Sequence, residues 1–298
     1  MSGVPLDPSV ASPPTPRLTL LYQNPETPLR EWYSEIFDPV VDEVVEDGSH
    51  TTVLDNCILS DSFVNTHDPA YYRKFHGKNA FLLLSPDEYY RTPLAAYQNF
   101  CGVFRSHYAG AFLAERIKQI PTGYNTGFGG LQSEKIASKR QYVWSFLGEA
   151  GKSTRPECLR SLMLVTPNYW YASDGWKPHG AVAATSQNLS AQDYTNNLRE
   201  SAFVPCPLGN VSQESLRVYE ALQVGAIPVL EKRRWMDAHR AVLGVHPLPT
   251  FFSWHDAAKA MAKWSREPET LDQLQQDCID WWRDYKLRLS GEVQDFVA

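Results

Sequence analysis

The stretch that most constrains the fold is residues 203–230, which read FVPCPLGNVSQESLRVYEALQVGAIPVL. A short apolar strand at 203–204 precedes a loop with Pro, Gly and Asn, and the helical pattern after the loop stops at Gly225. A second buried strand follows at 226–230. The stretch therefore predicts a strand–loop–helix–strand unit of an α/β protein.

The helix within this unit has recognisable start and stop signals. Ser212 is placed to be its N-cap, with Glu214 and Ser215 in the first turn, and Gly225 supplies the positive φ that ends a helix. A helix start that follows a glycine-containing loop presents unpaired N–H groups and a partial positive charge. We therefore expect an anion to bind there.

Two charged side chains follow the helix start on one face. Arg217 carries a fork of donors that suits a phosphate, and Glu220, three residues later, can accept hydrogen bonds from the two hydroxyls of a ribose. An ordinary solvated i,i+3 ion pair has the same spacing. Spacing alone leaves both interpretations open.

The run PLGN…ESLRVYEAL…GAIPV resembles the donor-nucleotide signature of exostosin-like glycosyltransferases, whose GT-B architecture has two Rossmann-like domains. The resemblance implies that Ser212, Ser215 and Arg217, with Asn210 in the loop before them, hold the diphosphate of a sugar nucleotide. It also implies that Glu220 holds the ribose.

Composition excludes several other classes of protein. A chain of 298 residues with 43% hydrophobic and 21% charged residues is typical of a soluble protein with two domains. The net charge of −6 argues against a general nucleic-acid binder, and no run of ~20 apolar residues predicts a membrane span. Five widely spaced cysteines without a CxxC pair indicate reduced thiols, no zinc site and a cytoplasmic setting without a signal segment.

The first half opens with a predicted strand at 18–22. An amphipathic helix interrupted by a proline is expected over 28–46, and a second strand over 51–54. That strand would place Asp55 and Asn56 at the ligand edge of the sheet, although an Asx turn closing the strand is the favoured interpretation.

Residues 79–90 read NAFLLLSPDEYY, a buried strand followed by a loop that contains Asp87 and Glu88. An inverting glycosyl transfer needs a general base, and a carboxylate at the crevice edge suits that role. Either acid is a candidate catalytic base. Acids after a proline also suit the first turn of a helix, so the pattern does not decide.

The next strand, at 103–108, ends in Arg105 and His107, which we assign to the acceptor side of the crevice. Together with the run IPTGYN at 120–125, this region is similar to a subset of exostosin-like enzymes that includes the ribitol xylosyltransferase and the chlorovirus glycan xylosyltransferase. Pro86 interrupts the Leu-Ser-Asp-Glu motif that is usual in this subset, and the insertion leaves open which acid faces the acceptor. His107 is a second possible base or a polar wall.

A polar segment ending at Arg140 is the expected interdomain linker, and the strand at 142–148 opens the second domain. The loop GEAGKSTRP after it is not a Walker A loop, because Phe146 stands where that motif needs glycine. The resemblance implies that Lys152 and Arg155 approach the donor phosphates. Solvated loop charges are the alternative.

Helices are expected over 191–200, 235–242, 256–265 and 271–288. The resemblance implies that the last helix crosses back to the first domain, and its aromatic residues suit that bridge. A plain terminal core helix is the alternative. The predicted organisation is a disordered leader (1–16), an acceptor-binding Rossmann-like domain (17–138), a nucleotide-sugar-binding Rossmann-like domain (139–275) and the returning helix (276–298).

The sequence thus predicts a UDP-sugar-dependent glycosyltransferase acting on a glycan acceptor, without a cofactor or a metal ion. Positive groups at the diphosphate replace the metal, and no Asp-x-Asp follows a hydrophobic strand. UDP-xylose as donor follows from the resemblance alone. The alternatives are a non-catalytic protein that binds sugar nucleotides or carbohydrate, and an epimerase, which would need a glycine motif that residues 18–27 lack.

Overall fold

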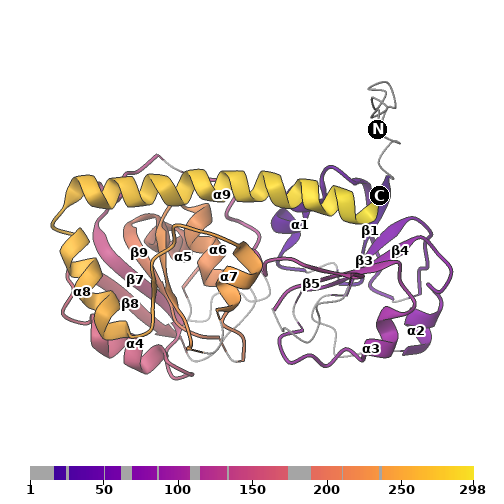
Figure 1. The fold of residues 1–298 in the computed structure, drawn as a ribbon, viewed down its shortest axis with the longest axis horizontal. Coiled ribbons are helices and arrows are strands. Elements are labelled where there is room, and N and C mark those ends of the chain that lie inside the picture. Colours follow the sequence, from indigo (N-terminus) through magenta and orange to yellow (C-terminus); the bar gives the residue numbers. More distant parts are fainter. Residues whose placement is uncertain are drawn as a thin grey trace, which may run out of the picture.

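The structure is a computed structural model that describes residues 17–24, 27–49, 51–61, 69–85, 87–107, 115–132, 134–173, 189–209, 211–234 and 237–298. Two parallel β-sheets lie side by side, and one long helix runs along both (Figure 1). The fold is α/β throughout, as the strand–loop–helix–strand pattern predicts.

The first sheet has the strand order β2-β1-β3-β4-β5-β6, with every neighbouring pair parallel. Its interior strands β3, β4 and β5 are buried along their whole length, which explains their continuous apolar sequences. The elements of this half are β1 (Leu18–Tyr22), α1 (Arg30–Phe37), β2 (Val41–Glu46), β3 (Cys57–Ser60), α2 (Pro69–Arg73), β4 (Ala80–Leu84), α3 (Leu94–Tyr97), β5 (Gly102–Arg105) and β6 (Ile117–Gln119).

The second sheet has the order β11-β10-β9-β7-β8 and is also parallel. Its central strands β9 and β10 flank helix α6 in sequence, which is the unit predicted from residues 203–230. The elements of this half are the 3-10 helix η2 (Ala137–Lys139), β7 (Tyr142–Glu149), α4 (Arg155–Leu162), β8 (Asn168–Ser173), α5 (Ala191–Arg199), β9 (Ser201–Cys206), α6 (Leu216–Gln223), β10 (Ile227–Glu231), α7 (Ala238–Leu243), β11 (Thr250–Phe251) and α8 (Trp254–Trp264).

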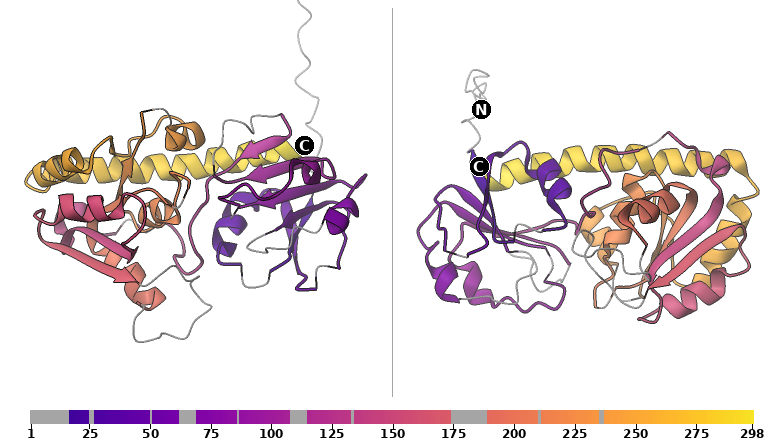
Figure 2. Two further views of the ribbon diagram at one scale, coloured as in Figure 1. Left: turned by 90° about the horizontal axis from the view of Figure 1, so that it is seen from below. Right: turned by 180° about the vertical axis from the view of Figure 1, so that it is seen from behind.

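Helix α9 (Pro268–Val297) crosses from the second sheet to the first, as Figure 2 shows from two further sides. At its far end the Phe296 ring lies 5.0 Å from that of Phe104, and Lys118 pairs with Glu292 at 2.6 Å. The helix begins before and ends after the predicted 271–288, because its apolar residues continue to Val297. Among the described residues, no helix combines the length and apolar character needed to cross a bilayer.

A cluster of aromatic rings joins the two halves beneath α9. The Trp32 ring, from α1, lies 5.7 Å from that of Trp282 on α9 and 6.5 Å from that of Tyr219 on α6. Gly123 passes so close that a Cβ there would sit 2.1 Å from Trp32. The hydrophobic core is therefore continuous across the junction between the halves.

The helix expected over 28–46 is wrong in its second part. Helix α1 ends at Phe37, and residues 41–46 form the edge strand β2 beside β1. Pro39 cannot continue a helix, and Val41, Val44 and Val45 favour the extended backbone.

The strand expected over 51–54 is also wrong, because the second buried strand begins at Cys57. Asp55 and Asn56 therefore lie at the amino end of β3, away from the ligand edge. The Asp55 carboxylate accepts hydrogen bonds from the amides of Asn56 (3.0 Å) and Asn79 (2.7 Å), and Asn56 has φ 54°. These residues form a turn, which is the alternative that the sequence left open.

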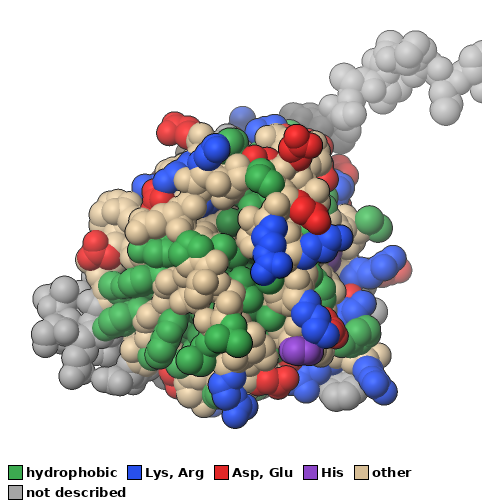
Figure 3. All heavy atoms as spheres, turned by 90° about the vertical axis from the view of Figure 1, so that its left-hand side faces the viewer, with side chains coloured by type: hydrophobic (Ala, Val, Ile, Leu, Met, Phe, Trp, Pro, Cys, Tyr) green, Lys and Arg blue, Asp and Glu red, His purple; other side chains and the backbone are tan. Residues whose placement is uncertain are grey.

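Several short elements were not expected, namely α2, β6, β8 and β11. The helix expected over 235–242 begins at Ala238, and residues 235–236 lie outside the described residues. Figure 3 views the end of the molecule formed by β8, α4 and α8, where hydrophobic side chains gather over one part of the face and Lys and Arg over the other. Trp170 on the edge strand β8 is half exposed.

Candidate functional site

The segments that follow the strands of both sheets meet at the junction. Three hydrogen bonds show this: Glu88, after β4, accepts from the loop after β9; Thr122, after β6, donates to Glu214; and Asn125 donates to Glu220. The parallel strands direct their carboxyl ends to this region, where ligands of open α/β sheets bind. Most of the predicted site residues therefore come together.

Glu88 reaches from the first half to the second. Its Oε1 accepts hydrogen bonds from the backbone amides of Val211 (2.7 Å) and Ser212 (3.0 Å). A Cβ at Gly209 would stand only 3.2 Å from the same oxygen, so the loop approaches closely where it has no side chain. The loop between β9 and α6 thus presents two N–H groups that hold an anionic oxygen.

Asp87 holds the loop after β4 in shape. Its two oxygens accept from the amides of Arg91 (2.6 Å) and Thr92 (3.0 Å), and it pairs with the fully buried Arg105 at 3.2 Å. Burial alone would raise the pKa of Asp87, but these amide hydrogen bonds and the Arg105 charge outweigh it and lower the pKa.

Arg105 also donates to the Asp87 carbonyl (2.9 Å) and to the Tyr97 hydroxyl (2.7 Å), so its charge is directed at the loop itself. His107 is 7% exposed with φ 60°, and its Nδ1 has no hydrogen-bond partner among the described residues. Burial lowers the pKa of His107, although the charges of Glu214 and Glu88 oppose that shift. The imidazole is therefore neutral at pH 7 and faces the same junction as Glu88.

Arg217 is buried at the start of α6 with part of its donor set unused. Its guanidinium lies 4.4 Å from the centre of the Phe146 ring, and Nη2 donates to the Leu147 carbonyl at 2.9 Å. Its Nε and Nη1 have no partner among the described residues. Gly148 makes room for the group, since a Cβ there would lie 2.9 Å from Nη2.

Arg155, at the start of α4, is the second cation of this cluster. It donates to the Glu149 carbonyl at 2.8 Å, while its Nε lacks a partner within the described part of the chain. Burial and the neighbouring Arg217 charge lower the pKa of Arg155 to about 10, so the Arg155 guanidinium remains charged at pH 7. Two neighbouring like charges with unpaired donors, one buried and one partly buried, are unfavourable unless an anion lies between them. Lys152, in contrast, already pairs with Glu149 at 2.5 Å.

The helix α6 begins later than predicted. Ser215, not Ser212, stands at its N-cap position, and the Ser215 hydroxyl has no partner among the described residues. Ser212 instead accepts from the Glu214 amide at 3.1 Å within a turn of the loop. The helix ends before Gly225, whose φ of 63° confirms the stop signal. Asn210 lies outside the described residues.

Glu220 is 2% exposed, and both of its carboxylate oxygens are engaged. Oε1 accepts from the Asn125 amide and Oε2 from the Tyr194 hydroxyl, each at 2.6 Å. Arg217 is 8% exposed and Glu220 2% exposed, and their hydrogen bonds go to Leu147, Asn125 and Tyr194, so the interpretation as a solvated surface pair is wrong.

Sequence reasoning missed the residues that tie the halves together. Glu214, 1% exposed, accepts from the Thr122 amide (3.2 Å) and the Tyr219 hydroxyl (2.6 Å). Thr122 and Asn125 belong to the run at 120–125 that carries part of the resemblance, which is the signal that could have drawn attention to them.

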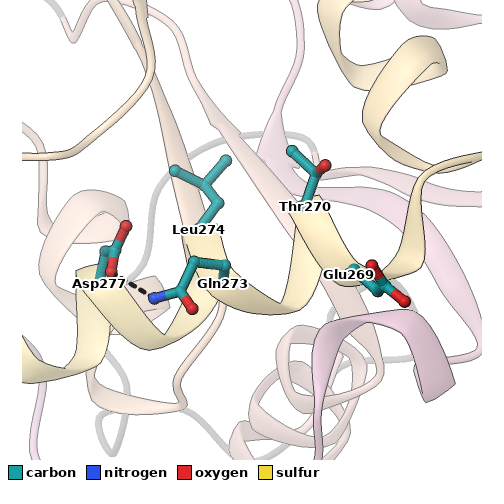
Figure 4. Close-up of a pocket in the computed structure, with 5 residues that line it drawn as sticks. All are labelled: Glu269, Thr270, Gln273, Leu274 and Asp277. Carbon is teal, nitrogen blue, oxygen red and sulfur yellow. Dashed lines mark hydrogen bonds between the residues drawn. The ribbon is translucent and has the colours of Figure 1, made fainter.

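A shallow hollow also lies on the outer face of α9, away from these residues (Figure 4). All its lining side chains come from one helix, and none is a predicted site residue. They are Glu269, Thr270, Gln273, Leu274 and Asp277, with Gln273 donating to Asp277 at 2.7 Å.

Known structures identify the class of fold. The chain resembles Anabaena HepE in complex with UDP and glucose with a TM-score of 0.56 and 10% identity, covering 94% of this chain and 99% of that one. It resembles the DNA-modifying enzyme β-glucosyltransferase with a TM-score of 0.55 and 9% identity, at 94% and 99% coverage. The two parallel sheets and the returning helix are those of the GT-B fold of glycosyltransferases.

The sequence then identifies the family. Residues 127–297 match the family model described as the RXYLT1 C-terminal domain, and the chain belongs to that family. This confirms the resemblance to the subset of exostosin-like enzymes that includes the ribitol xylosyltransferase.

Curated relatives agree with the family model. Ribitol-5-phosphate xylosyltransferase 1 of Mus musculus is 32% identical over 100 residues, which are 32% of this chain and 21% of that protein. The Danio rerio protein of the same name is 30% identical over 105 residues, 34% of this chain and 23% of that protein. The matched stretch thus spans about a fifth of these relatives' length.

Proposed function

We propose that this chain is a glycosyltransferase that moves a sugar, xylose, from a UDP-sugar to a hydroxyl group of a glycan acceptor. The observation that carries the proposal is the pair of the buried Arg217 and the partly buried Arg155, whose unused donors lie at the starts of two helices. The xylosyltransferase name of the curated relatives supports xylose, and the UDP in the HepE complex supports the nucleotide.

In this proposal the second half binds the donor. Arg155, Arg217 and the Ser215 hydroxyl donate to the diphosphate and neutralise its charge as the bond to the sugar breaks, so the reaction proceeds without a metal ion. Glu220 accepts hydrogen bonds from the ribose hydroxyls. Lys152 adds positive charge at the rim of this cluster, beside Glu149.

The first half supplies the base. Glu88 takes the proton of the acceptor hydroxyl while the hydroxyl oxygen attacks C1 of the sugar, and UDP leaves with the electron pair of the broken C1–O bond, which inverts the anomeric centre. Asp87 is the weaker candidate because three hydrogen-bonding partners occupy it and its pKa is lowered. Arg105 holds Asp87, and His107 lines the acceptor side.

The donor site is tested by Arg217→Ala, with UDP binding measured by calorimetry. Loss of charge-assisted hydrogen bonds is expected to weaken UDP binding by about tenfold or more. Arg160→Ala is the matched control, since Arg160 is an exposed arginine on α4 five residues after Arg155, and it should bind UDP as the wild type does. Unchanged UDP affinity in Arg217→Ala would refute the donor site.

The reaction is tested with UDP-xylose, UDP-glucose and GDP-sugars in the presence of EDTA, with release of the nucleoside diphosphate as readout. We expect UDP release from UDP-xylose when a glycan acceptor with free hydroxyls is present, and no loss of rate with the chelator. A protein that binds UDP tightly but releases none from any donor would instead be the non-catalytic binding protein.

A further inference from the structure

Three segments distant in sequence meet at the Glu220 carboxylate. Asn125 lies in the connection between β6 and β7, Tyr194 lies on α5, and Glu220 itself lies on α6. The hydrogen bonds to its two oxygens are both 2.6 Å, and all three side chains are at most 9% exposed. Such a buried, multiply held carboxylate has a defined orientation.

The orientation of the Asn125 amide follows from its partner. A carboxylate only accepts hydrogen bonds, so the Nδ2 group must face Glu220 and Oδ1 must point elsewhere. Asn125 is 2% exposed, and its Oδ1 has no hydrogen-bond partner among the described residues. A buried carbonyl oxygen of this kind needs a donor, which a ligand can supply.

The cluster therefore offers acceptors to a ligand. Each oxygen of Glu220 uses one lone pair on its protein partner and keeps a second one, and the Asn125 oxygen adds another acceptor. Burial and the Glu220 charge raise the pKa of Tyr194 well above its usual value, so its hydroxyl keeps its proton and donates to Glu220. A set of acceptors without free donors suits a group with neighbouring hydroxyls.

The position of the cluster relates it to the phosphate site. Arg217 precedes Glu220 by one turn on the same face of α6. The unused donors of Arg217 lie where the diphosphate is proposed to bind. A ribose joined to that diphosphate would then bring its two hydroxyls toward the carboxylate.

From this geometry we infer that Asn125 is a specificity-determining residue that accepts a hydrogen bond from a ribose hydroxyl of the donor nucleotide. Tyr194 is a positioning residue that acts through Glu220. The inference rests on the proposed function and adds a residue from the interdomain connection to a site otherwise built by the second half. Discrimination of ribose from deoxyribose then depends on the halves being docked as they are here.

The test compares the affinities of UDP, 2′-deoxy-UDP and 3′-deoxy-UDP by calorimetry. The wild type is expected to bind UDP about tenfold more tightly than at least one deoxy analogue. In Asn125→Ala the affinity for UDP should fall about tenfold while that for this analogue stays constant, so the preference disappears. Asn196→Ala, at an exposed asparagine on α5, should keep the preference.

Tyr194→Phe provides a second variant if Asn125→Ala does not fold. It removes one hydroxyl from the carboxylate and should reduce the same preference while the ring continues to fill its place. A variant that is merely less well folded is expected to bind all three nucleotides more weakly by the same factor. The ratio of two affinities therefore reports the ribose preference and not the fraction of folded protein. Equal losses would overturn the inference and leave the proposed function standing. A wild type that binds all three alike would overturn the inference together with the proposed ribose contact of Glu220, but not the proposed sugar transfer, whereas no binding of UDP at all would remove the proposed function.

Discussion

His239, on α7, is fully buried, and neither ring nitrogen has a hydrogen-bond partner among the described residues. Burial, with the charge of His246, lowers the pKa of His239 to about 4. The unfolded chain takes up this proton near pH 6.5 and the folded chain only near pH 4, so stability is lost as the pH falls through that window.

We expect the free energy of unfolding to fall by about 2 kcal/mol through His239 between pH 7 and pH 5. Urea denaturation of the wild type and of His239→Leu at both pH values measures this. The variant should lose less stability on acidification by about that amount, and equal losses in the two proteins would show that His239 does not protonate on unfolding.

The two adjacent acids after β4 should behave differently when each is made neutral. Asp87→Asn leaves the buried Arg105 without its counter-charge, so we expect a loss of about 3 kcal/mol in stability. Glu88→Gln keeps an acceptor for the Val211 and Ser212 amides, so its stability should change by less than about 1 kcal/mol while sugar transfer falls at least about 100-fold.

Thermal unfolding and UDP release from UDP-xylose separate these two effects. A Glu88→Gln enzyme that transfers sugar at the wild-type rate would remove Glu88 as the base. An Asp87→Asn protein as stable as the wild type would mean that the Asp87 contacts contribute little.

At this scale the sequence predicted the residues whose role depends on local position. The structure places Arg217 and Ser215 at the start of α6 and Gly225 directly after its end, and such local positions can be predicted from helix start and stop signals. Asn125 and Tyr194 are not predictable in this way, since their meeting with Glu220 is a product of tertiary packing across the junction.

At the scale of elements, buried strands were the easiest to predict and edge strands the hardest. Strand β4 is apolar at every position because it is covered on both faces, whereas β2 and β8 are edge strands with mixed, partly exposed sequences. The pattern of residues 28–46 therefore predicts a single helix, whereas in the structure Val41, Val44 and Val45 pair with β1.

Gly225, directly after α6, lies against the backbone of the segment that contains Gln132. Gly225 has φ 63°, and a Cβ there would lie 2.4 Å from the Gln132 carbonyl oxygen. Gly225→Ala should therefore lower stability by more than about 2 kcal/mol, from backbone strain and the clash together. Gly77→Ala is the matched control, because Gly77 has φ 79° with open space around it and should lose only about 1 kcal/mol. Similar losses in urea denaturation would contradict the close approach.

At the scale of the whole molecule, α9 and the aromatic cluster make the two halves one packed unit. The resemblance predicted a last helix that crosses back, and the structure confirms that α9 does so. It could not predict which rings meet, because Trp32, Tyr219 and Trp282 lie on three helices far apart in the chain. Their packing brings the segments after β4 and β9 within hydrogen-bond distance.

This arrangement predicts that the two halves unfold together. Trp282 is fully buried between Trp32 and Tyr219, so Trp282→Ala should lower stability by about 3–5 kcal/mol. Leu287→Ala, on the same helix but 70% exposed, should change it by less than about 0.5 kcal/mol. Calorimetry of the wild type should show one unfolding transition. In Trp282→Ala, loss of the aromatic cluster should divide that transition into two, because each half keeps the hydrophobic packing around its own sheet while the packing between the halves is lost. Two transitions in the wild type, or one unchanged transition in Trp282→Ala, would show that the aromatic cluster does not couple the halves.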